Sequence, residues 1–517
     1  MLLSRILPHV TALQPEHVAM KHGDDHITYQ QLLAAVNRVA YSYRVLGLQP
    51  GDRVALLGHP SPFLAIAECD AIAIGAVPVA LFPELSPLEL TLILDDAAPY
   101  AVIYDADESR LSSIVSTLAI PCLISCATRT DGPSLEQFIA ASPELTDWHT
   151  AEPDDLAIMV YTGGTTGRSK GVMHSHRAIS QWAFMSPSRG GGHYPAKKSL
   201  VPNQAHLTGQ FILWTTLYEG GCLIYASSYP LQAEEVADII EREQLKLLGT
   251  VGLLLHDLVH LDAKRIRQLR SIESISCGGM PISETTYAKA REVFPDARLT
   301  VVYSQTESGQ FISFLSVDSC FAEGKRHRLS SVGHPSHLDQ WGQTPFEVRI
   351  VDDAGQPVRP GEVGEIICKS DQIMLGYWNN PEETQKALRG GWLHTGDLGT
   401  MDEEGYLYVY DRKKDFLIVG GSNVYSAQVE AVLAMHPAVQ EAAVVGALLP
   451  DDSEQVVAVV VLREHSRLEL EELRRFCAPY LAEYKQPTRL ELVAALDRTA
   501  AGKLDKRAIK RKVLLQD

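Results

Sequence analysis

Apolar and polar residues follow two patterns along most of the chain. In residues 28–40 the apolar positions recur every three to four residues, which predicts an amphipathic helix. Residues 53–57 and 100–104 are short, largely apolar runs, which predict strands. The two patterns alternate to about residue 410, so we expect an α/β body of layered sheets and helices.

A charged cluster at residues 411–415 lies between two strand-like runs and marks a candidate hinge. The segment after the cluster has the patterns of a compact α+β module of roughly 100 residues, which is an ordinary domain size. Helical patterns occur at 427–435 and 468–480, and strand-like runs at 442–445 and 456–462. We therefore predict a large N-terminal domain over residues 1–411 and a small C-terminal domain over residues 412–517.

Composition narrows the class of protein. At 517 residues the chain exceeds the size at which one core stops growing, so more than one domain is expected. A formal net charge of −18 opposes general binding to nucleic acid or to an anionic membrane. No apolar run approaches the roughly 20 residues of a membrane span, and residues 1–8 do not resemble a signal peptide. The eight cysteines lack metal-ligand spacing, so we expect a cytoplasmic protein with reduced thiols and no integral membrane segment.

The most informative stretch, residues 161–171, joins a strand-like run to a loop of glycines and threonines that ends in a lysine. Glycine amides can form an anion-binding nest, and hydroxyls and an ammonium group add donors. The residues that would supply these groups are Thr162, Gly163, Gly164, Thr165, Thr166, Gly167 and Lys170. Ser169 stands where a Walker A loop needs glycine, and a plain turn would have a similar composition. We interpret the stretch as a site for nucleotide phosphates.

Further segments follow in an order and spacing that resemble the adenylate-forming (ANL) superfamily, in particular its acyl-CoA synthetases, the AMP-dependent carboxylate:CoA ligases. These segments are residues 201–210, 277–281, 303–307, 392–398, 420–425, 484–487 and 501–506. The resemblance covers nearly the whole chain. It implies a large N-terminal adenylate-forming domain and a small, mobile α+β C-terminal domain that rotates about a hinge near Lys414.

The resemblance implies a site for ATP and Mg²⁺. Tyr303 would pack on adenine, Thr306 would bond the α-phosphate, and Glu307 would ligate Mg²⁺, which prefers oxygen ligands. Ser304 replaces the glycine that the family carries in this segment. Further nucleotide-binding residues would be Gly278, Gly279, Asp397 and Arg412. An aspartate in a turn and a solvated charged cluster are the plain alternatives for the last two.

The acyl group would lie beside His206, Ala205 and Gly278. Ala205 stands where many relatives carry an aromatic residue, and a buried, hydrogen-bonded histidine is the alternative for His206. Residues 201–210 contain no aspartate of the kind that holds a substrate ammonium in amino-acid-activating relatives. The resemblance thus favours a fatty or aryl acid over an amino acid.

The C-terminal segments imply a thioester-forming site. Gly420, Gly421 and Lys485 would bind coenzyme A, and Lys503 would bridge the substrate carboxylate and the α-phosphate. The family's Glu, Pro and Glu are replaced in this region by Ser422, Ser426 and Gln428. The lysine-rich end of the chain could otherwise be a solvated helix.

The function that follows is an AMP-forming ligase with ATP, Mg²⁺ and CoA as cofactors. Its catalytic residues would be Lys503, Thr306, Glu307 and Lys170. A carboxylic acid and ATP would give an acyl-adenylate and pyrophosphate, and CoA would then give acyl-CoA and AMP. The acceptor could instead be a separate acyl carrier protein or an amine. A catalytically inactive scaffold is a further alternative, against which the presence of Lys503, Glu307 and Asp397 argues.

Overall fold

The computed structural model describes residues 2–105, 109–127, 132–162, 169–184, 197–278, 282, 284–335, 346–412, 417–419, 422–448, 454–499 and 502–514. The chain forms two compact units. The larger contains Met1–Val348 and Cys368–Leu393, and the smaller contains Arg349–Ile367 and His394–Asp517. This division concerns packing, so the predicted boundary of a mobile domain between residues 411 and 412 stays a prediction.

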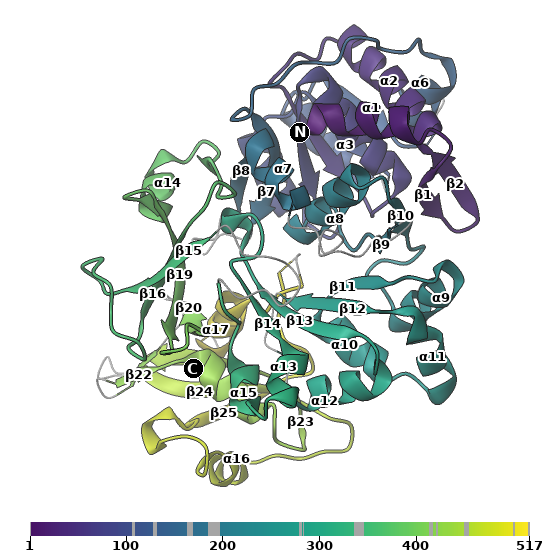
Figure 1. The fold of residues 1–517 in the computed structure, drawn as a ribbon. Helices are drawn as coiled ribbons and strands as arrows, with labels where there is room; N and C mark the ends of the chain where they lie inside the picture. The colour runs from purple at the N-terminus through teal and green to yellow at the C-terminus, as the bar shows by residue number, and fades with distance from the viewer. Residues whose placement is uncertain are drawn as a thin grey trace. The chain divides into compact units, whose positions relative to one another are not determined.

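A seven-stranded sheet in the order β17-β8-β7-β4-β3-β5-β6 organises the larger unit. Its strands β7 and β8 are labelled in Figure 1. Its strands are β3 (Arg53–Leu57), β4 (Val77–Leu81), β5 (Ala101–Tyr104), β6 (Cys122–Ser125), β7 (Leu156–Thr162), β8 (Lys170–Ser175) and β17 (Gly376–Tyr377). The pairs from β7 to β6 are parallel, whereas β8 runs antiparallel to both β7 and β17. The inner strands are buried along most of their length, which explains why the sequence shows continuous apolar runs there.

The helices of this region begin and end at residues with the expected capping chemistry. Thr28 and Ser86 each form a capping box at the start of a helix, and Ser61 accepts a hydrogen bond from the Leu64 amide. Gly75 ends its helix in the left-handed conformation, at φ 80°. The helices are α1 (Leu3–Leu13), α2 (Tyr29–Val45), α3 (Pro62–Ile74), α4 (Pro87–Ala97), α5 (Ser109–Thr117), α6 (Leu135–Ala141), α7 (His176–Phe184) and α8 (Leu207–Tyr218).

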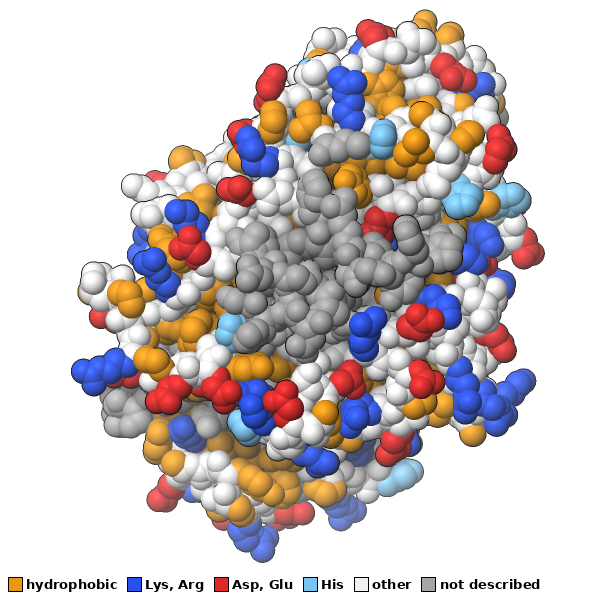
Figure 2. All heavy atoms as spheres, viewed as in Figure 1, with side chains coloured by type: hydrophobic (Ala, Val, Ile, Leu, Met, Phe, Trp, Pro, Cys, Tyr) orange, Lys and Arg blue, Asp and Glu red, His pale blue; other side chains and the backbone are white. Residues whose placement is uncertain are grey.

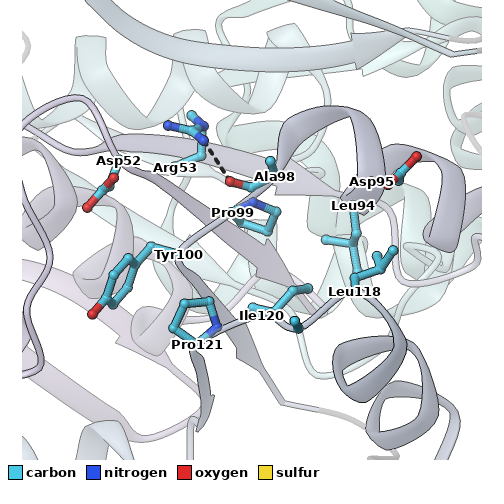
Figure 3. Close-up of a pocket in the computed structure, with 11 residues that line it drawn as sticks. Asp52, Arg53, Leu94, Asp95, Ala98, Pro99, Tyr100, Leu118, Ile120 and Pro121 are labelled. Carbon is cyan, nitrogen blue, oxygen red and sulfur yellow. Dashed lines mark hydrogen bonds between the residues drawn. The ribbon is translucent and has the colours of Figure 1, made fainter.

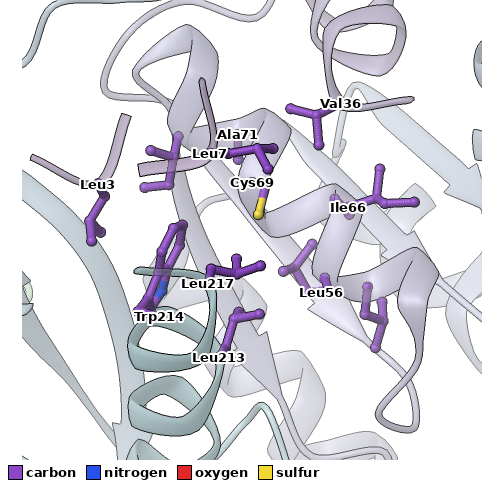
Figure 4. Close-up of a cluster of buried hydrophobic side chains, with 14 of the residues drawn as sticks. Leu3, Leu7, Val36, Leu56, Ile66, Cys69, Ala71, Leu213, Trp214 and Leu217 are labelled. Atoms are coloured by element: carbon purple, nitrogen blue, oxygen red, sulfur yellow. The ribbon is translucent and has the colours of Figure 1, made fainter. Parts of the chain in front are cut away.

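Helix α3 lies in the main hydrophobic core, where side chains of α1, α2 and α8 surround it (Figure 4). This core also contains a carboxyl group, because Glu68 of α3 is fully buried. Its two oxygens accept hydrogen bonds from Nε1 of Trp214 at 3.0 Å and from Nε2 of Gln210 at 3.1 Å. Nε2 of Gln210 also donates to the Gln204 carbonyl at 2.7 Å. Burial raises the pKa of Glu68 to about 7, although these hydrogen bonds oppose the rise.

Two four-stranded sheets complete the larger unit. One contains β2 (Asp25–Thr28), β1 (Val18–His22), β10 (Cys222–Tyr225) and β9 (Lys198–Leu200). The other contains β11 (Leu247–Val251), β12 (Ser274–Gly278), β13 (Arg298–Tyr303) and β14 (Ser313–Ser316). The remaining helices are α9 (Ala233–Glu243), α10 (Gly252–Val259), α11 (Ala263–Gln268), α12 (Glu284–Val293), α13 (Val317–Ala322) and α14 (Pro381–Ala387). Because β11, β12 and β13 are parallel, their carboxyl ends meet at one edge of the sheet.

A five-stranded sheet has the order β15-β16-β19-β18, and β20 pairs with β19. Its strands are β15 (Glu347–Val351), β16 (Gly364–Lys369), β18 (Leu388–Arg389), β19 (Trp392–Met401) and β20 (Leu407–Arg412). The smaller unit adds β21 (Leu417–Val419), β22 (Ser422–Val424), β23 (Val439–Leu448), β24 (Glu454–Leu462), β25 (Arg489–Leu492), α15 (Ser426–Leu433), α16 (Leu470–Cys477) and α17 (Lys506–Leu514). Alternate residues of β24 pack with α15 and α16 in one cluster and with α17 in another, so both faces of its sheet are covered.

The α/β fold class is confirmed, as are elements named from sequence. Residues 28–40 lie in α2 and its cap, 53–57 form β3, and 456–462 lie in β24. Among the residues that the structure describes, none of the helices has the length and apolarity needed to cross a bilayer.

Candidate active site

The strand that leads into the glycine-rich loop and the strand that leaves it are paired. Thr162, the last residue of β7, lies opposite Lys170, the first residue of β8, in antiparallel register. Both ends of the loop are therefore anchored in the main sheet. Predicted residues Gly163, Gly164, Thr165, Thr166 and Gly167 lie outside the described residues.

Lys170 contacts two residues that the sequence analysis did not single out, Tyr377 and Glu383. Its Nζ donates to Oε2 of Glu383 on α14, and Nζ lies 4.8 Å from the centroid of the Tyr377 ring. The Tyr377 hydroxyl donates to Oε1 of Glu307 at 2.9 Å. Tyr377 thus joins the predicted phosphate-binding lysine to the predicted magnesium ligand. We call Lys170, Tyr377, Glu307 and Glu383 the tyrosine-centred cluster.

The Glu307 backbone is also held in place. Glu307 belongs to a 3₁₀ turn, Thr306–Ser308, and its carbonyl accepts from the Met374 amide at 3.0 Å. Gln305 and Ser308 cap the turn reciprocally. Thr306 and Glu307 are therefore presented on a turn that is bonded at both ends, just beyond the carboxyl end of β13.

Tyr303 and Gly278 occupy the carboxyl ends of adjacent parallel strands, and Ser304 follows as an exposed residue. Gly278 has a structural reason to be glycine. A Cβ there would lie 2.6 Å from Cγ2 of Val302 and 2.8 Å from its carbonyl oxygen. Close packing of β12 on β13 thus requires the glycine whether or not a ligand passes nearby. Gly279 lies outside the described residues.

His206 caps helix α8. Its Nδ1 accepts from the Thr208 amide at 3.1 Å, which places the proton of a neutral ring on Nε2. The preceding Ala205 is buried, and its amide donates to Oδ1 of Asn203 at 2.8 Å. The histidine predicted to lie beside the acyl group therefore has a fixed backbone and a fixed tautomer.

The two predicted ribose-binding residues are paired within the smaller unit. Asp397 on β19 lies opposite Arg412 on β20, and Nε of Arg412 is 2.8 Å from Oδ1 of Asp397. Asp397 is buried, and its amide donates to Oγ1 of Thr395 at 3.1 Å. An ionised, oriented carboxylate is the group that a pair of vicinal hydroxyls would need.

Two residues that depart from the family's motif in the C-terminal segments, Ser426 and Gln428, form side-chain hydrogen bonds. The amide and hydroxyl of Ser426 both donate to Oδ2 of Asp411 at 2.6 Å, and a proline could make neither bond. Oε1 of Gln428 accepts from Nζ of Lys485 at 2.9 Å, so a neutral amide holds the predicted CoA-binding lysine. Lys503 is exposed in the bend that precedes α17, and its carbonyl accepts from the Thr499 amide at 2.8 Å. Lys414, Gly420 and Gly421 lie outside the described residues.

The larger unit also contains a cavity of about 340 Å³ (Figure 3). None of the residues predicted to act on a substrate lines it. Arg53 at its edge donates to the carbonyls of Gly51, Ala97 and Ala98, which commits the guanidinium to the end of α4. On the face drawn in Figure 2, acidic and basic side chains of the described residues are interspersed.

Tyr377 and Glu383 were missed because nothing in their local sequence indicates a partner in β8. The strand β17 has two residues, too few to show a period, and the Lys170–Glu383 pair joins positions 213 residues apart. The Gly376-Tyr377-Trp378 run followed by a helix start at Asn380 is a weak sign of a buried strand before a helix.

This α/β fold is that of the adenylate-forming enzymes. The chain belongs to the AMP-binding enzyme family, since residues 7–378 match its model and residues 428–503 match the AMP-binding enzyme C-terminal domain. The predicted membership of the adenylate-forming superfamily is thereby confirmed.

Two relatives cover nearly the whole chain. A feruloyl-CoA synthase from Amycolatopsis sp. is 32% identical over 507 residues, which are 97% of this chain and 96% of the relative. The long-chain-fatty-acid–CoA ligase FadD13 of Mycobacterium tuberculosis is 30% identical over 504 residues, which are 94% and 93% of the two chains. The prediction of an acid–thiol ligase is confirmed at the level of the family.

Two solved structures share the fold. The amide bond synthetase McbA from Marinactinospora thermotolerans has a TM-score of 0.85 at 29% identity, over 99% of this chain and 100% of its own. The o-succinylbenzoate CoA synthetase MenE from Bacillus subtilis, in complex with ATP and magnesium ion, has a TM-score of 0.84 at 27% identity, over 98% and 99%. ATP, Mg²⁺ and CoA as cofactors are thus confirmed for the family.

Proposed function

We propose that this chain activates a carboxylic acid with Mg·ATP and transfers the acyl group to CoA. The observation that carries the proposal is the tyrosine-centred cluster, which gathers a lysine and a carboxylate beside a glycine-rich loop in an AMP-binding family member. The names of the feruloyl-CoA and long-chain-fatty-acid relatives support an aryl or fatty acid as the substrate.

In the first step a carboxylate oxygen of the acid attacks the α-phosphorus of ATP, and the bond to pyrophosphate breaks. The Lys503 ammonium and the Thr306 hydroxyl would stabilise the negative charge of the transition state, and Lys170 would face the phosphate tail. The Glu307 carboxylate fits Mg²⁺, because it supplies an oxygen ligand whose orientation Tyr377 fixes. Bound Mg²⁺ would neutralise phosphate charge.

The nucleoside would be held by other residues. Asp397 would accept hydrogen bonds from both ribose hydroxyls, and the contact with Nε of Arg412 orients that carboxylate. Tyr303 would pack on adenine beside Gly278. The imidazole of His206, whose Nδ1 accepts from the Thr208 amide, would lie beside the acyl carboxylate with Nε2–H as a hydrogen-bond donor.

In the second step the CoA thiol attacks the carbonyl carbon of the acyl-adenylate, and AMP leaves. Rotation at Lys414 would withdraw Lys503 and bring Gly420 and Gly421 over the acyl group. Lys485 would bind a CoA phosphate in exchange for Gln428. This exchange is favourable for a partly exposed lysine, because a phosphate carries the charge that the amide lacks.

A separate acyl carrier protein or an amine is the alternative acceptor. The fold shared with the amide bond synthetase McbA supports the amine, and the replacement of the family's Glu, Pro and Glu by Ser422, Ser426 and Gln428 leaves this acceptor open.

The test is pyrophosphate release from Mg·ATP with panels of aryl, fatty and amino acids, each with and without CoA. Turnover that requires one aryl or fatty acid and CoA, with acyl-CoA detected by mass spectrometry, is the expected result. Adenylate that accumulates in the presence of CoA and is discharged by an amine or a phosphopantetheinylated carrier would select the alternative. No release with any acid would refute the proposal.

A further inference from the structure

Lys170 is held from two sides. Its Nζ donates to Oε2 of Glu383 and also faces the Tyr377 ring at 4.8 Å. Its side chain is only 12% exposed, so solvent competes weakly with these two partners. Tyr377 is fixed in turn, because β17 pairs with β8 and the Tyr377 amide donates to Oγ1 of Thr384 at 2.9 Å. Loss of Glu383 would therefore leave the ammonium aimed at the same place.

Glu383 has a second cation. Nζ of Lys386, one helical turn further along α14, lies 2.7 Å from Oε1 of Glu383. The two carboxylate oxygens thus bind two different lysines. These cations lower the pKa of Glu383 to about 2, with Lys170 as the larger cause, so the carboxylate is ionised at any working pH. If a ligand takes Lys170, Lys386 still pairs with Glu383.

We propose that Glu383 competes with nucleotide phosphates for Lys170, and that Lys386 makes this exchange reversible. The inference rests on the proposed use of Mg·ATP. Phosphate oxygens and the carboxylate seek the same ammonium protons, and the two anions repel each other across it. Glu383 therefore weakens the binding of ATP and speeds the loss of pyrophosphate after the first step.

The test measures the binding of Mg·ATP and of magnesium pyrophosphate to the full chain by titration calorimetry, with no acid present. Glu383→Gln should lower both dissociation constants by a factor of about 3 to 10, the range for the net gain of one ordinary hydrogen bond. A variant that merely damaged α14 would move them the other way. The matched control is Glu382→Gln, which makes the same charge change on the neighbouring exposed residue and should leave both constants unaltered.

A second set of variants in the same binding experiment tests the role of Lys386. Lys386→Gln should raise the dissociation constant of pyrophosphate by a factor of about 3 in the parent chain. It should have no effect when Glu383→Gln is already present, whereas loss of a general surface charge would act equally in both backgrounds.

The outcomes separate this inference from the proposed function. A chain that binds Mg·ATP but whose Glu383→Gln variant binds pyrophosphate no more tightly overturns the inference alone. A chain that does not bind Mg·ATP refutes the proposed function and the inference with it.

Discussion

The buried carboxyl group of Glu68 should make the stability of the larger unit depend on pH. Burial raises the pKa of Glu68 from 4.5 to about 7. Between these values the folded protein keeps a proton that the unfolded chain has released, so stability falls as pH rises from about 4.5 to about 7. Below this window the effect is absent, and above it the full penalty applies.

The size of the effect follows from the same two values. At ~1.4 kcal/mol for each pH unit, the gap amounts to ~3 kcal/mol of unfolding free energy. The figure needs no discount for solvent screening, because Glu68 is fully buried. Glu68→Gln removes the titrating group. The substitution also turns an amide nitrogen towards the donor of Trp214 or Gln210. The cost of that contact does not depend on pH, so it cancels when the stability of the variant is compared at two pH values.

The assay is urea unfolding followed by tryptophan fluorescence at pH 5 and pH 8. Stability should fall between these pH values by ~3 kcal/mol less in Glu68→Gln than in the parent chain. Glu16→Gln, the same change at an exposed position, serves as the control and should follow the parent. Equal pH dependence in Glu68→Gln and the parent would refute the reasoning, since it would mean that Glu68 titrates alike in both states.

Three other changes test separate parts of the molecule. Lys503→Ala should abolish adenylate formation, measured as pyrophosphate release, yet spare thioester formation from supplied acyl-adenylate; loss of both would remove the proposed division of labour. Tyr377→Phe keeps the ring under Lys170 but removes the donor to Glu307, so half-maximal pyrophosphate release should need several times more Mg²⁺, and an unchanged requirement would argue against this role. Gly333→Ala should lower the melting temperature much more than Gly324→Ala does. Both glycines have a positive φ, but a Cβ at Gly333 would lie 2.0 Å from the Phe314 carbonyl, whereas Gly324 faces open space. Equal losses in melting temperature would contradict the packing argument.

Local patterns sufficed to predict strands and helices but not their long-range partners. Strands such as β3 and β7 could be recognised because burial on both faces leaves a continuous apolar run. The motif residues Glu307 and Lys170 could be named from their segments. That Tyr377 joins them could not, because a two-residue strand has no period.

For some motif residues, the structure gives a packing or hydrogen-bonding reason for the residue type that the motif itself does not reveal. Gly278 was predicted to lie beside the nucleotide and the acyl group, which stays a prediction, and the structure adds a packing reason for this glycine in the proximity of Val302. Ser426 departs from the family's proline, and its two bonds to Asp411 give a reason that no local pattern contains. Both depend on neighbours that are distant along the chain or on another strand, which a one-dimensional pattern does not specify.

The pairing of β17 with β8 has a consequence for synthesis of the chain. Strand β8 carries Lys170 at its start, and one of its edges is covered only when Gly376 lies opposite Met173, about 200 residues later. At ~5–20 residues per second, the ribosome needs roughly 10–40 s to make that distance. During this interval β8 presents an unpaired edge next to the apolar β7, which favours pairing with another nascent chain. We expect ribosome-bound chains that end before Gly376 to aggregate, and chains extended past Trp378 to resist aggregation. Synthesis of β17 would then end the period in which the nascent chain is prone to aggregate.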